Sequence, residues 1–183
     1  MRTSLLLGMI ALLGACTERA PSPAAPSMAR TAAAEEPAAA ASKLLDAEGI
    51  GAIRFGMTLD QAQQAVGTKA SLPQPFDPAC SMVRFPGLPK LRFMVENGVV
   101  TRADAEAGVD NALGVAVGDT LAAVRASHPE AQVSRHKYDE NGHYLTFPSA
   151  DGRAAIILEE SGGKVTKMRA GLQPAVAYVE TCL

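Results

Sequence analysis

The chain has 183 residues with 17 basic and 19 acidic side chains, so its formal net charge at pH 7 is −2. Because both signs of charge are mixed, the composition argues against binding to the phosphate backbone of nucleic acids. Aromatic residues make up 4% of the chain and Trp is absent, which leaves little for stacking sugars or bases and predicts an aliphatic core.

The first residues have the pattern of an export signal. Met1 and Arg2 precede an apolar run over residues 5–13, which is too short to span a bilayer but suits the core of a signal peptide. The run ends in Leu13-Gly14-Ala15-Cys16, which resembles the lipobox of bacterial lipoproteins. That resemblance implies removal of residues 1–15 and attachment of lipid and acyl groups, such as palmitate, at Cys16. An ordinary signal peptide with a chance cysteine is the alternative.

A tether is expected between the lipid and the folded part. Residue Thr17, in place of Asp, is similar to the pattern that directs lipoproteins to the outer membrane, so we expect an anchor there that faces the periplasm. Residues 17–43 contain 11 Ala and 4 Pro among 27 positions, with no apolar periodicity. Such a segment cannot bury enough apolar surface to offset the entropy of ordering it. We therefore interpret residues 16–43 as the lipidated cysteine and a disordered tether.

One helix-opening phrase occurs twice, 62 positions apart by the match of Gly56 with Gly118. In each copy the glycine is followed two residues later by a Thr, Thr58 or Thr120, which suits a helix N-cap. Gln61 completes a capping box in the first copy. Helices are therefore predicted over about 58–66 and 120–127, the second ending before Pro129.

Strands follow each predicted helix. The expected strands cover about 82–85, 91–96 and 99–105, then 131–138, 143–148, 153–159 and 164–170, with a terminal strand at 175–182. Four dipeptides typical of tight turns separate them: Asn97-Gly98, Asn141-Gly142, Asp151-Gly152 and Gly162-Gly163. Successive side chains along each strand are expected to point alternately to the core side and to the opposite side of the sheet.

The pattern predicts an α+β domain over residues 44–183. It consists of two tandem repeats, about 51–108 and 113–171, each a short helix followed by an antiparallel β-meander, with the helices on one face of a nearly continuous sheet. This arrangement resembles the fold of β-lactamase inhibitor proteins. The phrase Phe55-Gly56-Met57-Thr58 with Val66-Gly67 also resembles the start of the small lipoprotein of the β-barrel assembly machinery. Neither family is an enzyme, so the resemblances imply binding, although no family binding motif is matched.

The cysteines predict one disulfide. Because Cys16 is expected to carry lipid, Cys80 and Cys182 remain as an even pair in an oxidising compartment. The alternative is a redox or metal pair, but the sequence has no CxxC motif and no His close to either cysteine.

No motif for catalysis is found, and we expect no enzyme, cofactor or metal. A nucleophile elbow is absent, and Ser161-Gly162-Gly163-Lys164 is interpreted as a hairpin turn rather than a phosphate-binding loop. The three histidines lack metal-ligand spacing. His136 and His143 face each other across a turn, where a two-His metal site competes with the interpretation as surface histidines. The acidic pair Glu159-Glu160 is interpreted as solvated charge beside a turn.

Strand alternation defines the candidate binding face. Nine residues are assigned to the helix-facing side: Val83, Phe85, Leu91, Phe93, Val95, Leu145, Phe147, Ile156 and Leu158. The other side is predicted to be open and basic, with partner-binding residues Arg84, Arg92, Met94, Arg102, Tyr144, Lys167 and Arg169, accompanied by Asp104, Arg153 and Ile157. Arg and Tyr are common energetic anchors at protein interfaces, whereas a solvated sheet face is the alternative.

These observations predict a lipid-anchored envelope protein that binds a protein partner, with an acidic surface, through the open sheet face. It is expected to act as a hydrolase inhibitor or an immunity-type protein. A role in outer-membrane assembly is the alternative, and a periplasmic enzyme is the third class.

Overall fold

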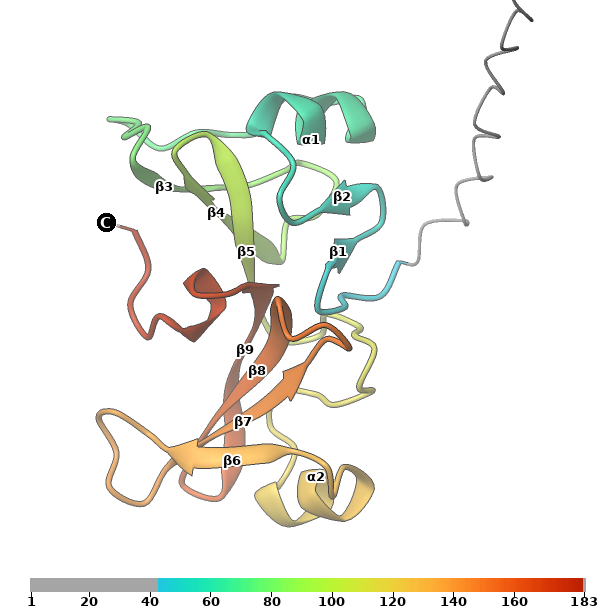
Figure 1. The fold of residues 1–183 in the computed structure, drawn as a ribbon, viewed down its shortest axis with the longest axis vertical. Helices are drawn as coiled ribbons and strands as arrows, with labels where there is room; N and C mark the ends of the chain where they lie inside the picture. The colour runs from blue at the N-terminus through green and yellow to red at the C-terminus, as the bar shows by residue number, and fades with distance from the viewer. Residues whose placement is uncertain (1–42, 183) are drawn as a thin grey trace, which may run out of the picture. The chain divides into compact units, whose positions relative to one another are not determined.

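The computed structural model describes residues 43–182, so the predicted signal peptide, Cys16 and the tether up to residue 42 lie outside the described residues. The described part is α+β, as predicted, with two α-helices, a seven-stranded antiparallel sheet and a two-stranded sheet (Figure 1). Its elements are β1 (Gly49–Ile50), β2 (Ile53–Arg54), α1 (Leu59–Val66), β3 (Cys80–Val83), β4 (Leu91–Glu96), β5 (Val99–Ala105), α2 (Leu121–Ser127), β6 (Gln132–Arg135), β7 (His143–Pro148), β8 (Ala154–Ser161), β9 (Lys164–Leu172) and the 3₁₀-helix η1 (Ala175–Ala177).

The large sheet joins two groups of strands edge to edge. Its order is β3-β4-β5-β9-β8-β7-β6, so three strands that follow α1 meet four strands that follow α2. The junction is the antiparallel pair β5–β9, in which Arg102 lies opposite Gly171 and Asp104 opposite Arg169. Every other neighbouring pair in this sheet is formed by strands consecutive in sequence.

Both predicted helices are confirmed, with their caps. The Thr58 hydroxyl accepts a hydrogen bond from Gln61 N, and the Gln61 side chain accepts one from Thr58 N, which completes the capping box. Gly67 ends α1 with φ 70°, a left-handed conformation that glycine adopts without strain. Thr120 caps α2 by accepting from Ala123 N.

Each helix-opening stretch docks on the hairpin that ends its group of strands. Gly56 N donates to Val100 O at 2.8 Å, and Leu59 N donates to Gly98 O at 2.9 Å. In the second group Gly118 N donates to Val165 O at 2.8 Å, and Leu121 N donates to Gly163 O at 2.9 Å. The two stretches are therefore held on the β4–β5 and β8–β9 hairpins by hydrogen bonds of the same pattern.

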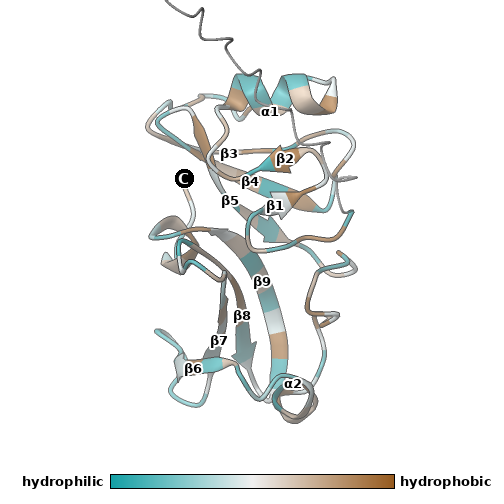
Figure 2. Ribbon diagram, turned by 45° about the vertical axis from the view of Figure 1, so that its right-hand side comes forward, coloured by the Kyte–Doolittle hydropathy of each residue, from teal (hydrophilic) through white to brown (hydrophobic). Residues whose placement is uncertain are grey.

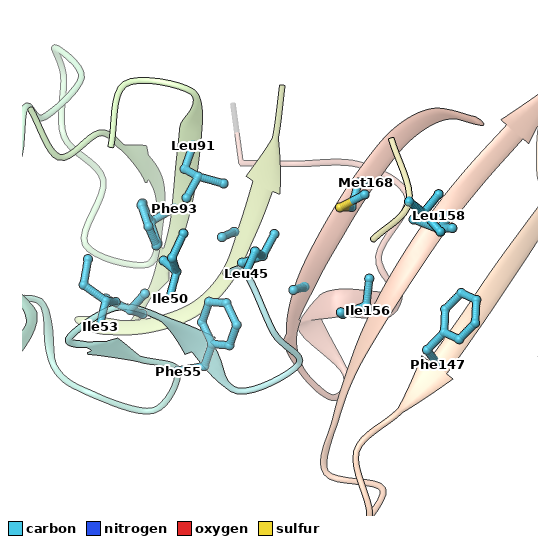
Figure 3. Close-up of a cluster of buried hydrophobic side chains, with 14 of the residues drawn as sticks. Leu45, Ile50, Ile53, Phe55, Leu91, Phe93, Phe147, Ile156, Leu158 and Met168 are labelled. Atoms are coloured by element: carbon cyan, nitrogen blue, oxygen red, sulfur yellow. The ribbon is translucent and has the colours of Figure 1, made fainter. Parts of the chain in front are cut away.

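One buried cluster holds the elements together (Figure 3). All nine residues assigned to the helix-facing side belong to it, which confirms the phase of the predicted strands. Ala62 of α1 and Val124 of α2 join the same cluster, and Leu59 and Val66 at the two ends of α1 pack against it. Hydrophilic residues of α1 lie between these apolar positions (Figure 2). Phe85 and Phe93 meet edge to face with their ring centroids 5.2 Å apart, an arrangement that adds to the stability from burial alone.

Three details of the predicted strands were wrong. The strand expected at 82–85 lies at Cys80–Val83, because Arg84 exchanges backbone hydrogen bonds with Ser71 instead. The strand expected at 131–138 ends at Arg135, where the His136 ring accepts backbone hydrogen bonds from Tyr138 and Asp139 and turns the chain. The short β1–β2 hairpin was not predicted.

The terminal strand predicted over 175–182 is absent. Residues Ala175–Ala177 form η1, in which Ala177 N donates to Pro174 O, and no strand follows before residue 182. We call residues 173–182 the C-terminal segment. It lies against β5, β8 and β9 through η1 (Figure 1).

Candidate functional site

The candidate site is the sheet face opposite the main core, called here the second face. It carries Arg92 and Asp104 near the junction of the two strand groups, and Glu159, Lys167 and Arg169 on β8 and β9. Strand alternation predicted a common side for Arg92, Asp104, Lys167 and Arg169, and the pairing of Arg92 with Asp104 and of Asp104 with Arg169 agrees with that placement. Glu159, which lies opposite Lys167, was not predicted there.

The second face is not open over its whole width, which corrects the prediction for three of the seven candidate residues. Met94, Arg102 and Arg169 are 1–3% exposed. The C-terminal segment lies over them, so they cannot contact a partner while it is in place. Four residues keep accessible side chains: Arg84, Arg92, Tyr144 and Lys167.

Two buried arginines hold the C-terminal segment by its backbone. Arg102 Nη1 donates to Tyr178 O at 2.7 Å and to Ala175 O at 3.3 Å. Arg169 Nε donates to Val176 O at 2.6 Å. Between these contacts the side chain of Val176 is fully buried in a small apolar cluster with Ala155 and Ile157, against which Tyr144 packs.

The same arginines are paired with carboxylates, of which Glu159 is buried and Asp104 is 16% exposed. Arg102 Nε donates to Asp104 Oδ1 at 2.7 Å, and Arg169 Nη1 donates to Glu159. Burial raises the pKa of Glu159, but the charges of Arg169 and Lys167 outweigh burial and hold its pKa below the ordinary value. Glu159 is therefore an ionised member of a buried network, and the interpretation of Glu159-Glu160 as solvated charge was wrong.

Glu160 is equally buried, but its contacts are with residues at the β8–β9 turn and on β7. It is 1% exposed, and its Oε1 accepts from Gly163 N at 2.6 Å while its Oε2 lies 2.7 Å from His143 Nδ1. The sequence shows the two glutamates side by side beside a turn, and nothing in that pattern signals the register shift after Glu159 that buries both.

His136 and His143 belong to different contacts. His136 Nδ1 accepts from two backbone N–H groups, so its proton lies on Nε2, which is 3.5 Å from Glu159 Oε2. Its ring stacks on Tyr144 with the centroids 4.7 Å apart. Within residues 43–182, no group of three or more His, Cys, Asp or Glu side chains is arranged to hold a metal ion.

A cavity of about 490 Å³ remains between the second face and the C-terminal segment. Its lining includes Arg92, Asp104, Lys167 and Arg169 from the sheet and Glu180 from the segment. Arg92 and Lys167 have side chains 44% and 68% exposed, so both reach solvent at its edge. A group that enters this cavity meets charged donors and acceptors together with the apolar side chains of Ala105, Met168 and Val179.

Asp104 Oδ2 faces this region without a hydrogen-bond partner, and it is the single buried side-chain N or O atom in that condition among the residues that the structure describes. Arg92 Nη2 lies 3.9 Å away, which is an ion pair but too long for a hydrogen bond. Arg92 is thus a cavity-lining cation that faces the unpartnered oxygen of Asp104.

The second face is less basic than predicted. Arg84 pairs with Glu106 at 2.7 Å, Lys167 with Glu159 at 3.2 Å, and Arg153 with Asp151 at 2.5 Å. These carboxylates cancel most of the positive charge that the cations contribute. Glu159 is shared between Lys167 and Arg169, so it does not cancel the charge of both. Electrostatic attraction of an acidic partner at the cavity therefore depends on its two accessible cations, Arg92 and Lys167.

The end of the C-terminal segment is fixed by the predicted disulfide. Cys80 and Cys182 are bonded, with 102 residues of separation in sequence. Glu180 adds a contact with Lys137 at 2.8 Å and another with the hydroxyl of Tyr138. Both hydrogen bonds lower the pKa of Glu180 to about 2.

Noncovalent contacts alone barely balance the cost of ordering this segment. Hydrogen bonds to charged groups contribute about 1.5–3 kcal/mol each, and burial of one Val a similar amount, so the arginine contacts and Val176 together provide roughly 6–12 kcal/mol. Ordering the backbone of residues 175–182 costs roughly 8–16 kcal/mol. Because these ranges overlap, the disulfide at the end of the segment contributes to keeping it on the face.

A larger cavity of about 690 Å³ lies elsewhere, between the β1–β2 hairpin and the start of β8. Phe55, Leu172 and Ala154 provide its apolar lining. Its two arginines, Arg54 and Arg153, are each paired with a carboxylate close in sequence, Asp46 and Asp151. This cavity includes none of the seven residues predicted to bind a partner.

No helix within residues 43–182 is both long enough and apolar enough to cross a membrane. Comparisons of the chain with models of known protein families, with curated protein sequences and with solved structures found no match.

Proposed function

We propose that this protein is a lipid-anchored, periplasm-facing protein of the bacterial envelope that binds a protein partner and is not an enzyme. The anchor is supported by the position of Cys16 directly after the apolar run at residues 5–13. Binding is supported by the cleft on the second face. The proposed binding site is therefore smaller than the open face that strand alternation predicts, because it includes only the accessible part of that face.

The observation that carries the proposal is the pair of accessible cations beside the cavity. Lys167 has three donor positions and contacts Glu159 at 3.2 Å, and Arg92 lies beyond hydrogen-bond distance of Asp104. Both cations line the same cavity, so an acidic side chain of a partner that enters it offers acceptors to either of them. Such charges speed encounter and fix orientation more than they tighten the final complex.

We further propose that residues 51–108 and 113–171 are tandem repeats with both helices on the core side of the sheet. The support is the matching pattern of hydrogen bonds from Gly56 and Leu59 and from Gly118 and Leu121. This architecture resembles the β-lactamase inhibitor proteins, which favours a hydrolase inhibitor or an immunity-type protein. The Phe55–Thr58 phrase favours the alternative, a role in outer-membrane assembly.

Capture of the partner tests the binding cleft. Cells that express the full lipoprotein are crosslinked, and the proteins recovered with it are identified by mass spectrometry. The double variant Arg92→Glu/Lys167→Glu should lose most of the recovered partner, and the loss should shrink as salt screens the charges. The matched control is Lys69→Glu/Arg125→Glu, which reverses two exposed cations outside the second face. Equal recovery with both folded double variants would reject the cleft.

The identity of the captured protein separates the function classes. A secreted hydrolase whose activity falls when the purified lipoprotein is added supports the inhibitor. Lower levels of outer-membrane barrel proteins in a deletion strain support the assembly role instead. The anchor is tested separately, because Cys16→Ser should remove the acyl mass from the intact protein and release it from the membrane fraction. A wild-type mature protein without acyl mass would contradict the anchor.

A further inference from the structure

The C-terminal segment lies on the second face as a bound peptide would. Its backbone carbonyls at Ala175, Val176 and Tyr178 accept hydrogen bonds from the two buried arginines, Arg102 and Arg169. One side chain, Val176, fills the apolar recess formed by Ala155 and Ile157. Recognition thus uses backbone acceptors for position and one aliphatic side chain for selectivity, in a segment that forms a 3₁₀ turn at Ala175–Ala177.

The charges of this surface are internally balanced. Arg102 is paired with Asp104, and Arg169 with Glu159, so each guanidinium that reaches the segment has a carboxylate beside it. Val176 lies between the two arginine contacts and is fully buried. The surface therefore favours a neutral, aliphatic segment, in contrast to the acidic group that suits Arg92 and Lys167.

We propose that the surface formed by Arg102, Arg169, Ala155, Ile157 and Tyr144 is a second binding surface, for a short peptide segment in a turn conformation with a Val-like side chain, and that the C-terminal segment is its resident ligand. This inference rests on the proposed function, because it assumes that the protein binds other proteins and adds a peptide segment as a second kind of partner. The surface becomes available when the Cys80–Cys182 bond is opened.

Opening needs a reductant of the dithiol class, either a small molecule or a thiol–disulfide oxidoreductase. The dithiol supplies two electrons and two protons, the S–S bond between Cys80 and Cys182 breaks, and both cysteines become thiols while the dithiol becomes a disulfide. Once the bond is open, the segment is held by noncovalent contacts alone, among them those of Arg102, Arg169, Val176 and Glu180. It then exchanges between the bound and the released positions.

Hydrogen exchange on the full mature chain tests the release. The amide groups of Ala177 and Tyr178 donate within η1, at 2.9 and 3.2 Å, and their exchange reports whether η1 stays formed. After dithiol treatment these amides should exchange at least about tenfold faster, because the local opening free energy falls. The β5–β9 amides serve as the internal control and should not change. Unchanged exchange at Ala177 and Tyr178 after complete reduction would overturn the proposal.

Addition of the segment in trans tests the ligand chemistry. The protein's own segment competes with an effective concentration of about millimolar, so it must first be disabled. The full-chain variant Val176→Asp/Cys182→Ser does this, and the probe is a synthetic peptide with the sequence of residues 173–180. This peptide should bind the variant at least about tenfold more tightly than the same peptide carrying Val176→Asp, as expected for loss of a buried aliphatic anchor. Neither peptide should bind the oxidised wild-type protein.

Equal binding of the two peptides to the folded variant, or no binding of either, would also overturn the proposal. If the variant does not fold, the exchange measurement on the wild-type chain decides the question. Neither measurement involves the envelope partner. Loss of capture by Arg92→Glu/Lys167→Glu therefore tests the cleft alone, and the peptide result tests this second surface alone.

Discussion

The guanidinium of Arg102 donates a hydrogen bond of 2.7 Å to the carbonyl oxygen of Tyr178, which lies 76 residues later in the chain. The same guanidinium pairs with Asp104 at 2.7 Å. A single buried side chain thus connects a strand at the centre of the large sheet with the last residues that the structure describes. Several predictions about stability depend on this connection and on its neighbours.

Replacement of Arg102 should strongly destabilise the protein. Arg102→Met removes the hydrogen bonds to the C-terminal segment and leaves Asp104 without its closest cation, a loss that costs about 3–5 kcal/mol for buried pairs. The control is Arg84→Met, which breaks the exposed pair with Glu106 and should cost about 0–1 kcal/mol. Urea unfolding followed by circular dichroism measures both. Similar free energies of unfolding for the two variants would contradict the buried role of Arg102.

Gly171 should not tolerate even a methyl group. A Cβ at this position would lie 2.4 Å from Thr101 O and 2.7 Å from the Cα of Arg102, both on the facing strand β5. Gly171→Ala should therefore force β5 and β9 apart and cost about 1–3 kcal/mol. At Gly87, where no atom lies within 4 Å, the change to Ala should stay within about 0.5 kcal/mol. The difference in melting temperature between the two variants checks the close approach.

Loss of the disulfide should destabilise the protein and leave the other half of the pair as a titratable thiol. In a Cys16→Ser background, Cys182→Ser should lower the free energy of unfolding by about 2–5 kcal/mol, because the bond closes a long loop in the unfolded chain. The Cys16→Ser single variant, never exposed to reductant, should show no free thiol on titration. Two free thiols in that protein would show that the bond does not form.

Acid should weaken the attachment of Glu180. Its pKa lies at about 2 in the folded protein against an ordinary 4.5, so the unfolded chain binds more protons between these values. The contribution of Glu180 is therefore complete above pH 4.5 and falls as the pH is lowered towards 2. Thermal unfolding between pH 6 and pH 2 should show a smaller acid-induced decrease for Glu180→Gln than for the wild type. Identical pH profiles would contradict the contacts with Lys137 and Tyr138.

The sequence was sufficient for features set by local chemistry. Thr58 with Gln61 predicts a capping box, Asn97-Gly98 predicts a hairpin, and strand alternation predicts that Phe93 lies in the core. Each of these patterns depends only on neighbours a few residues away. The prediction of a terminal strand was wrong because it also relied on local sequence pattern alone. Val176 and Tyr178 alternate like strand residues, but contacts with Arg102 and Arg169, more distant in sequence, keep the segment in a 3₁₀ turn and an irregular course.

The second face shows the same limit. Alternation correctly separated Arg102 and Arg169 from the core, yet whether a side chain is exposed depends on what lies above it. Nothing in the local sequence signals that residues 173–182 return to cover both arginines. Glu159 was missed for a related reason, since its buried partner Arg169 lies on a neighbouring strand.

The order of the seven strands also has a consequence for how the chain folds. All pairs except β5–β9 join strands consecutive in sequence, so each meander can form from contacts of short sequence separation. The β5–β9 ladder joins residues as distant as Arg102 and Gly171, and it closes a loop that contains α2 and three strands. Contacts of this kind are the slow ones in folding. We therefore expect the two meanders to form early and their edge-to-edge docking to limit the folding rate.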